Sequence, residues 1–294
     1  MELKSLSPIL LTSEVAECKG KEVTLKGEAL KKLIKNALIY TRLREDKKLF
    51  DEFYKKLLWW KEFYDENKEN RKEVLRQLKA IGTWLEKKVF CGGEPEIVNG
   101  EVVNFDEKKN LLNFVKVSDF VLREGKVMEK APKVVGERKK ILKPIKVASK
   151  GAIFEGRLEI DESYKGLKNP SPVADYLKAE KLTELLNRFS LKVLEVDKEF
   201  FVEGGYAKTL KVLEEIEAES GDRLWKINFE EGVLPFGAEI FVYERLETPK
   251  GRKEYHHLNE IFKILSSEGW AGEVFSNTRK ISPEGYPFGW FSQI

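Results

Sequence analysis

Two helical patterns of apolar residues in the first third of the chain constrain the fold most strongly. One stripe contains Phe50, Phe53, Tyr54, Leu57 and Leu58, and the next contains Val74, Leu78, Ile81 and Leu85. Apolar residues that recur at spacings of three and four lie on one face of an α-helix. The polar stretch 65–71 turns the chain between them, so residues 46–90 predict a helical hairpin. The hairpin interrupts alternating strand and helix patterns, which together predict an α+β fold.

Three tryptophans, Trp59, Trp60 and Trp84, lie in this helical region. They could form a platform on which bases stack, or they could belong to the apolar core. Aromatic side chains at helical spacing are more often core residues, so the core interpretation is favoured.

Other elements are expected on both sides of the hairpin. The first is a strand over Glu2–Leu11 that is broken at Ser7-Pro8. A helix is expected from Gly27, because Leu30, Leu33, Ile34, Ala37 and Leu38 share one face. A β-hairpin turns at Asn99-Gly100. Further strands are predicted at 113–117, 141–147, 152–160, 224–229 and 239–243, and further helices at 170–200, 209–218 and near 258–265.

Charge and cysteine content exclude several classes of protein. The chain has 294 residues, with 53 Lys and Arg against 50 Asp and Glu, so a nucleic-acid surface would require local sorting of charge. Cys18 and Cys91 belong to no shared motif, so neither a disulfide framework nor a metal site is expected. The apolar run at the N-terminus is too short for a signal peptide, and none reaches the length of a membrane span. We therefore expect a cytoplasmic protein with no membrane partner and no cofactor.

Two segments combine glycine with lysine at the start of a predicted helix. Gly27 precedes Lys31 and Lys35, and Gly204-Gly205 precedes Lys208-Thr209. A glycine at such a position lets a phosphate approach backbone N–H groups, and a lysine in the first turns adds positive charge. A solvated helix face is the competing interpretation. The second segment lacks the spacing of a nucleotide-binding phosphate loop, so an ATPase is rejected.

Groups suited to catalysis are scarce. The adjacent His256 and His257 are the only side chains with an ordinary pKa near neutrality, and neighbouring side chains seldom converge on one centre. The basic cluster at 138–140 is interpreted as a solvated loop, with phosphate contact as the alternative. No catalytic residue is therefore assigned.

Several motifs along the chain match a known family in order. They are the helix start from Gly27 to Leu38, FVKVSD at 114–119, the strand at 150–161, the glycine segment at 204–209, Thr278-Arg279 and the terminal Pro287–Trp290. In these motifs the sequence resembles the repeat-associated mysterious proteins (RAMP) of CRISPR effector complexes, and among them the fifth Csm subunit of type III-A complexes. The matches span nearly the whole chain.

The resemblance implies tandem ferredoxin-like domains related to RNA-recognition modules. The first would span 1–145 with the helical insertion at about 46–90, and the second would span 146–294. It also implies a non-catalytic subunit that binds the 3′ region of the crRNA and caps the filament of backbone RAMP subunits. The expected RNA-binding residues are Gly27, Lys31, Lys35, Gly204, Gly205, Lys208, Thr209 and Arg279.

Three points stay open at the level of sequence. Arg279 could pair with a carboxylate instead of a phosphate. The chain could be a metal-independent, guide-processing endoribonuclease of the same superfamily that uses His256 or His257, or an adaptor that contacts only proteins. Whether the helical insertion recruits a nuclease that trims the guide 3′ end is also undecided.

Overall fold

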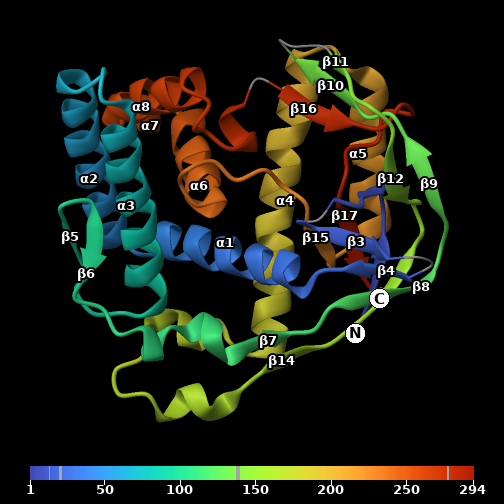
Figure 1. The fold of residues 1–294 in the computed structure, drawn as a ribbon, viewed down its shortest axis with the longest axis horizontal. Coiled ribbons are helices and arrows are strands. Elements are labelled where there is room, and N and C mark those ends of the chain that lie inside the picture. Colours follow the sequence, from blue (N-terminus) through green and yellow to red (C-terminus); the bar gives the residue numbers. More distant parts are fainter. Residues whose placement is uncertain (13, 20–21, 137–139, 277) are drawn as a thin grey trace.

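The protein is described by a computed structural model that covers residues 1–12, 14–19, 22–136, 140–276 and 278–294 (Figure 1). In these residues the largest sheet has seven antiparallel strands in the order β15-β17-β1-β13-β8-β4-β3. The strands are β1 (Glu2–Ser5), β3 (Ala16–Lys19), β4 (Glu22–Leu25), β8 (Phe120–Glu124), β13 (Ile153–Glu155), β15 (Leu224–Lys226) and β17 (Trp290–Gln293). The first and last strands are neighbours, with Lys4 opposite Ser292, so the two ends of the chain lie together.

The described residues also form smaller antiparallel sheets. One contains β11 (Lys140–Ile141), β10 (Lys133–Gly136) and β16 (Thr278–Ile281), and another contains β2 (Ile9–Leu10), β12 (Ile145–Ala148) and β9 (Val127–Lys130). Two pairs complete the set: β14 (Leu158–Ile160) with β7 (Val115–Val117), and β5 (Glu96–Val98) with β6 (Glu101–Val103). The predicted turn of the last pair is confirmed, because Asn99 and Gly100 have φ of 50° and 73°.

Helix α1 (Gly27–Glu45) packs against α4 (Ala179–Glu203) and α6 (Phe236–Glu247). Its predicted apolar face is buried, and Asn36 on the same helix is buried as well. The Asn36 side chain accepts a hydrogen bond from the Gly237 N–H at 2.8 Å. A Cβ at Gly237 would lie 2.0 Å from the Asn36 carbonyl oxygen, so the two helices cross with backbone in close contact.

The predicted helical hairpin is present as α2 (Lys47–Glu66) and α3 (Arg71–Phe90). Asp46 and Asn70 cap the two helices by accepting hydrogen bonds from the backbone N–H groups of Leu49 and Glu73. Trp60 and Trp84 are buried, and their indole N–H groups donate to the carbonyl oxygens of Val74 and Pro95. The core interpretation is therefore confirmed for these two tryptophans.

Trp59 is different, because it is 46% exposed and stacks on Phe63 with 5.6 Å between ring centroids. The core interpretation is wrong for this residue. Adjacent helical positions point about 100° apart, and on α2 the side of Trp60 is covered while that of Trp59 is not.

The C-terminal half adds α5 (Ala207–Ser220), α7 (Pro249–Glu254) and α8 (His256–Ser267). The predicted strand at 239–243 is wrong, because these residues lie in α6. Phe236, Ala238, Ile240, Phe241 and Val242 are all buried. A short apolar run that is buried on every side does not distinguish a strand from a helix. Short 3₁₀ helices lie at Glu107–Lys109, Leu111–Phe114, Glu162–Gly166, Pro172–Tyr176 and Glu273–Phe275.

The α+β class is confirmed. Buried apolar side chains from Leu3 to Phe291 form one large cluster in the described residues. The main sheet takes strands from both sides of the predicted boundary between residues 145 and 146. The division into tandem ferredoxin-like domains stays a prediction.

Candidate nucleic-acid interface

A groove of about 1070 Å³ lies beside the first turns of α1. We call it the α1 groove. Its walls are residues of α1 and the preceding loop, the segment that follows β15, and the start of β16. The basic side chains that line it are Lys26, Lys31, Lys32, Lys35, Lys226, Arg279 and Lys280, and the acidic ones are Glu14, Glu28, Glu230, Glu231 and Glu273.

Gly27 lets α1 begin close to the neighbouring loop. A Cβ at this position would lie 2.6 Å from the carbonyl oxygen of Val117 and 2.7 Å from that of Ser118. The Gly27 N–H donates to Asp119 Oδ1 at 2.9 Å. The glycine is therefore required by packing within the chain, and the N–H expected to face a phosphate has a carboxylate partner.

The lysines of α1 differ in their surroundings. Lys35 Nζ lies 2.9 Å from Glu86 Oε1 and 3.6 Å from Glu231 Oε1, and Lys32 Nζ lies 3.1 Å from Glu231 Oε2. Burial disfavours the charged form of Lys35, but the carboxylates of Glu86 and Glu231 outweigh it and raise its pKa. Lys31 is half-buried and has no ion-pair partner in the part of the chain that the structure describes. Lys31 is therefore the cation on this face that is left to bind an external anion.

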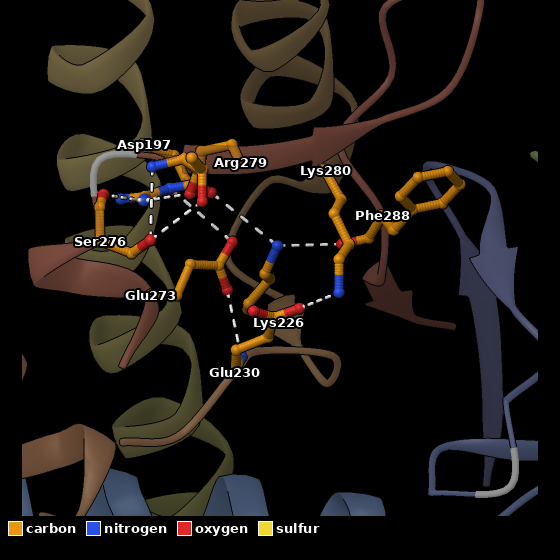
Figure 2. Close-up of polar contacts among 9 residues, drawn as sticks. Asp197, Lys226, Glu230, Glu273, Ser276, Arg279, Lys280 and Phe288 are labelled. Carbon is orange, nitrogen blue, oxygen red and sulfur yellow. Dashed lines mark hydrogen bonds and ion pairs between the residues drawn. The ribbon is translucent and has the colours of Figure 1, made fainter. Parts of the chain in front are cut away.

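A buried ionic network forms the wall of the groove opposite α1 (Figure 2). Asp197 of α4 lies 3.0 Å from Arg279 Nε and 3.8 Å from Lys226 Nζ, and all three side chains are at most 4% exposed. Arg279 Nε is also 3.7 Å from Glu273 Oε1. Burial raises the pKa of Glu273, and the positive charges of Lys226 and Arg279 work against that increase.

Arg279 has a carboxylate partner in this network. Its guanidinium also donates to the carbonyl oxygens of Ser276 and Thr278, and it lies 4.5 Å from the centroid of the Phe200 ring. Its donors thus serve the protein interior, and the carboxylate partner that the sequence left open is the observed one.

Lys226 of β15 and Lys280 of β16 contribute to the groove although the sequence did not single them out. Lys226 donates to the Phe288 carbonyl oxygen at 2.9 Å and lies 4.7 Å from the Trp290 ring centroid. Lys280 pairs with Glu230 at the rim (Figure 2). The alternation of polar and apolar residues in Trp225–Phe229 was a usable signal, because it puts Lys226 and Asn228 on one side of an extended segment.

The second glycine segment lies elsewhere. Gly204 ends α4, Gly205 has φ of 71°, and Lys208 is an exposed residue in the first turn of α5. Thr209 is buried and caps no helix with its side chain. None of these residues lines the α1 groove. The structure therefore brings Lys31, Lys35 and Arg279 to one groove and leaves Gly204, Gly205, Lys208 and Thr209 outside it.

The candidate catalytic histidines are also remote from the groove. His256 and His257 begin α8, and His257 Nδ1 lies 3.4 Å from Glu260 Oε2. Of the basic cluster at 138–140, residues 138 and 139 lie outside the described residues, and Lys140 is in β11.

Neither a metal site nor a membrane span is found in the described part of the chain. No group of three or more His, Cys, Asp or Glu residues in it is placed to hold a metal ion. No helix in it combines the length and the apolar character that crossing a membrane requires.

Comparisons with known proteins were informative only at the level of structure. Neither a protein-family model nor a curated protein matches the sequence. The crystal structure of Csm5 from T. onnurineus matches with a TM-score of 0.57 and 15% identity, over 94% of this chain and 72% of that one. A chain in the cryo-EM structure of a Csm–crRNA–target RNA ternary complex of a type III-A CRISPR-Cas system matches with a TM-score of 0.52 and 16% identity, over 92% of this chain and 72% of that one. The chain thus has the fold of these Csm proteins along nearly its whole length.

Proposed function

We propose that this chain is a non-catalytic, RNA-binding subunit of a type III-A CRISPR effector complex in the cytoplasm. Its role would be to hold the 3′ region of the crRNA and to cap the filament of backbone RAMP subunits. The observation that carries the proposal is the likeness in fold to Csm5 and to a chain of a Csm–crRNA–target RNA complex, over 94% and 92% of this chain. The ordered motifs in the sequence support the same assignment.

The α1 groove supports RNA as the ligand. Among the described residues it exposes one unpaired cation, Lys31, against walls whose other positive charges are largely balanced by carboxylates. Such a site gives a phosphate one strong contact without a large background attraction for any polyanion. Lys208 would be a separate contact, because it is exposed outside the groove.

A ferredoxin-like unit is part of this proposal. Along the chain the order is β1, α1, β8, β13, α4 and β17, and across the sheet the strands follow as β17-β1-β13-β8. This order supports one βαββαβ unit that uses both ends of the chain. A second such unit within 146–294 stays a prediction.

The proposal is tested on the assembled complex. The type III-A complex from the same source is purified with and without this chain, and the copurified guide RNA is sequenced. We expect the guide 3′ ends to become heterogeneous or displaced when the chain is missing. Identical 3′ ends in the two preparations would contradict a role at that end.

The endoribonuclease alternative has its own test. The isolated protein is incubated with repeat RNA, beside a variant in which both His256 and His257 are replaced by Ala. We expect no cleavage by either protein, because these histidines line no groove that carries the basic residues. Cleavage that depends on the histidines would establish the enzyme instead.

A further inference from the structure

A second groove, of about 450 Å³, lies on the other side of the first turn of α1. We call it the β7 groove, because Val115, Lys116 and Val117 of β7 form its floor. Glu28 and Lys31 line both grooves. These two residues are three positions apart and so share one face of α1. The two grooves therefore meet at a single helical turn, with Lys31 at the junction.

Arg157 is a second unpaired cation of the β7 groove, beside Lys31. It is exposed, it lines the groove, and no carboxylate in the described residues lies within ion-pair distance of its side chain. Lys116, on the same wall, is 2.9 Å from Asp161 Oδ2. In the described residues the α1 groove thus has one unpaired basic residue, Lys31, and the β7 groove has two, Lys31 and Arg157.

The backbone at Arg157 is fixed in place. Its N–H donates to Ser118 Oγ at 2.8 Å, and the Ser118 N–H donates to the Arg157 carbonyl oxygen at 2.9 Å. Gly156 is as closely packed, because a Cβ there would lie 2.5 Å from the Phe120 ring. A guanidinium on such an anchor loses less freedom on binding than one on a loose loop, which favours a specific contact.

We propose that a single-stranded RNA bound in the α1 groove continues over the first turn of α1 into the β7 groove. Lys31 contacts a phosphate at the crossing, and Arg157 contacts a phosphate beyond it. The inference rests on the proposed function and extends it, because it assigns Arg157 as an RNA-binding residue and gives the path of the strand.

Glu28 provides a second test of the proposed RNA path. Its carboxylate lines both grooves and has no ion-pair partner in the described part of the chain, so it repels a phosphate at the crossing. In the first turn of α1 the same charge favours the helix. Glu28→Gln is therefore expected to tighten RNA binding while slightly lowering stability. Tighter binding by a less stable variant could not result from improved folding.

The test uses the purified protein and unstructured RNA oligonucleotides of about 4 and about 16 nucleotides, which bracket common site sizes for single-strand binders. Arg157→Ala is compared with Arg123→Ala, because Arg123 is also exposed but pairs with Glu155 and lines neither groove. We expect Arg157→Ala to weaken binding of the long oligonucleotide about tenfold at low salt and to leave the short one unchanged. The slope of log affinity against log salt should fall by about 0.7 for the long one.

Three outcomes distinguish a failure of the proposed RNA path from a failure of the proposed function. The path is supported if Arg157→Ala weakens RNA binding, Glu28→Gln tightens it, and Arg123→Ala binds like the wild type. Wild-type binding of both oligonucleotides with no effect of Arg157→Ala overturns the path and leaves the proposed function standing. No binding of either oligonucleotide by the wild type, alone or in the assembled complex, overturns the proposed function and the path with it.

Discussion

Arg279 Nε lies 3.0 Å from Asp197 Oδ1, and the two side chains are only 3% and 4% exposed. The pair joins β16 to the C-terminal part of α4, and the other Asp197 oxygen faces Lys226 of β15. One carboxylate therefore links a helix to two strands behind the α1 groove (Figure 2).

Replacing Arg279 by Ala should strongly destabilise the fold. The change leaves Asp197 buried with a weaker, more distant partner, and loss of one member of a buried pair costs about 3–5 kcal/mol. The free energy of unfolding is measured in urea. Arg123→Ala is the control, because its exposed pair with Glu155 should contribute less than about 1 kcal/mol. Equal stabilities of the two variants would show that the buried network is not structural.

Replacing Gly27 by Ala should lower stability before any RNA is added. The new Cβ meets the backbone carbonyl oxygens of Val117 and Ser118 at 2.6–2.7 Å, and overpacking of this kind costs about 1–3 kcal/mol. Thermal unfolding is compared with that of Gly166→Ala, where nothing lies within 4 Å of the new Cβ. If Gly27→Ala unfolds like the wild type and only RNA binding falls, the glycine serves the ligand instead.

Replacing Lys31 should affect mainly RNA binding, whereas replacing Lys35 should affect mainly stability. Lys31→Ala removes an unpaired cation, so RNA affinity and its salt dependence should fall while stability changes by less than about 0.5 kcal/mol. Lys35→Ala leaves Glu86 without this cation and Glu231 with Lys32 alone, and should lower stability by about 1 kcal/mol. Urea unfolding and RNA titration of both variants check this, and the reverse pattern would refute the assignment of Lys31 as the contact.

The two adjacent tryptophans of α2 should differ widely on replacement. Trp60→Ala removes a fully buried ring and its hydrogen bond to the Val74 carbonyl, which should cost about 3–5 kcal/mol. Trp59→Ala removes a half-exposed ring and should cost well under half of that. Denaturation midpoints of the two variants provide the measurement. Comparable losses would mean that Trp59 is covered in solution.

Glu239 should make the protein less stable as pH rises. Full burial, with a smaller contribution from the charge of Glu231, raises the pKa of this carboxyl to about 8, although hydrogen bonds from the Gly272 N–H work against the increase. Between its ordinary pKa and about 8 the folded state binds more protons than the unfolded state, so the free energy of unfolding falls across this window.

The matched variant is Glu239→Gln, followed by urea unfolding at pH 5 to pH 8.5. The wild type should lose up to about 1.4 kcal/mol per pH unit more than the variant. Glu273 has a pKa raised in the same direction, so the variant should keep a smaller slope of its own. Parallel curves for the two proteins would show that Glu239 is charged when folded.

The sequence alone determined the local elements. The apolar spacing of α1, α2, α3 and α5 predicts these helices, and Asn99-Gly100 predicts its turn, because these patterns depend on residues near one another in the chain. The residues 239–243 were predicted wrongly, because an apolar run buried on all sides carries no periodicity.

The tertiary structure decided what the site residues do. Lys31 and Lys35 are equivalent in sequence, but only Lys35 meets Glu86 and Glu231, which lie on other elements. Arg279 is 82 residues from Asp197 along the chain, so no local pattern reveals that pair. Charge pairing between distant segments thus determines which cations stay available to a phosphate, and that depends on how the helices and strands pack.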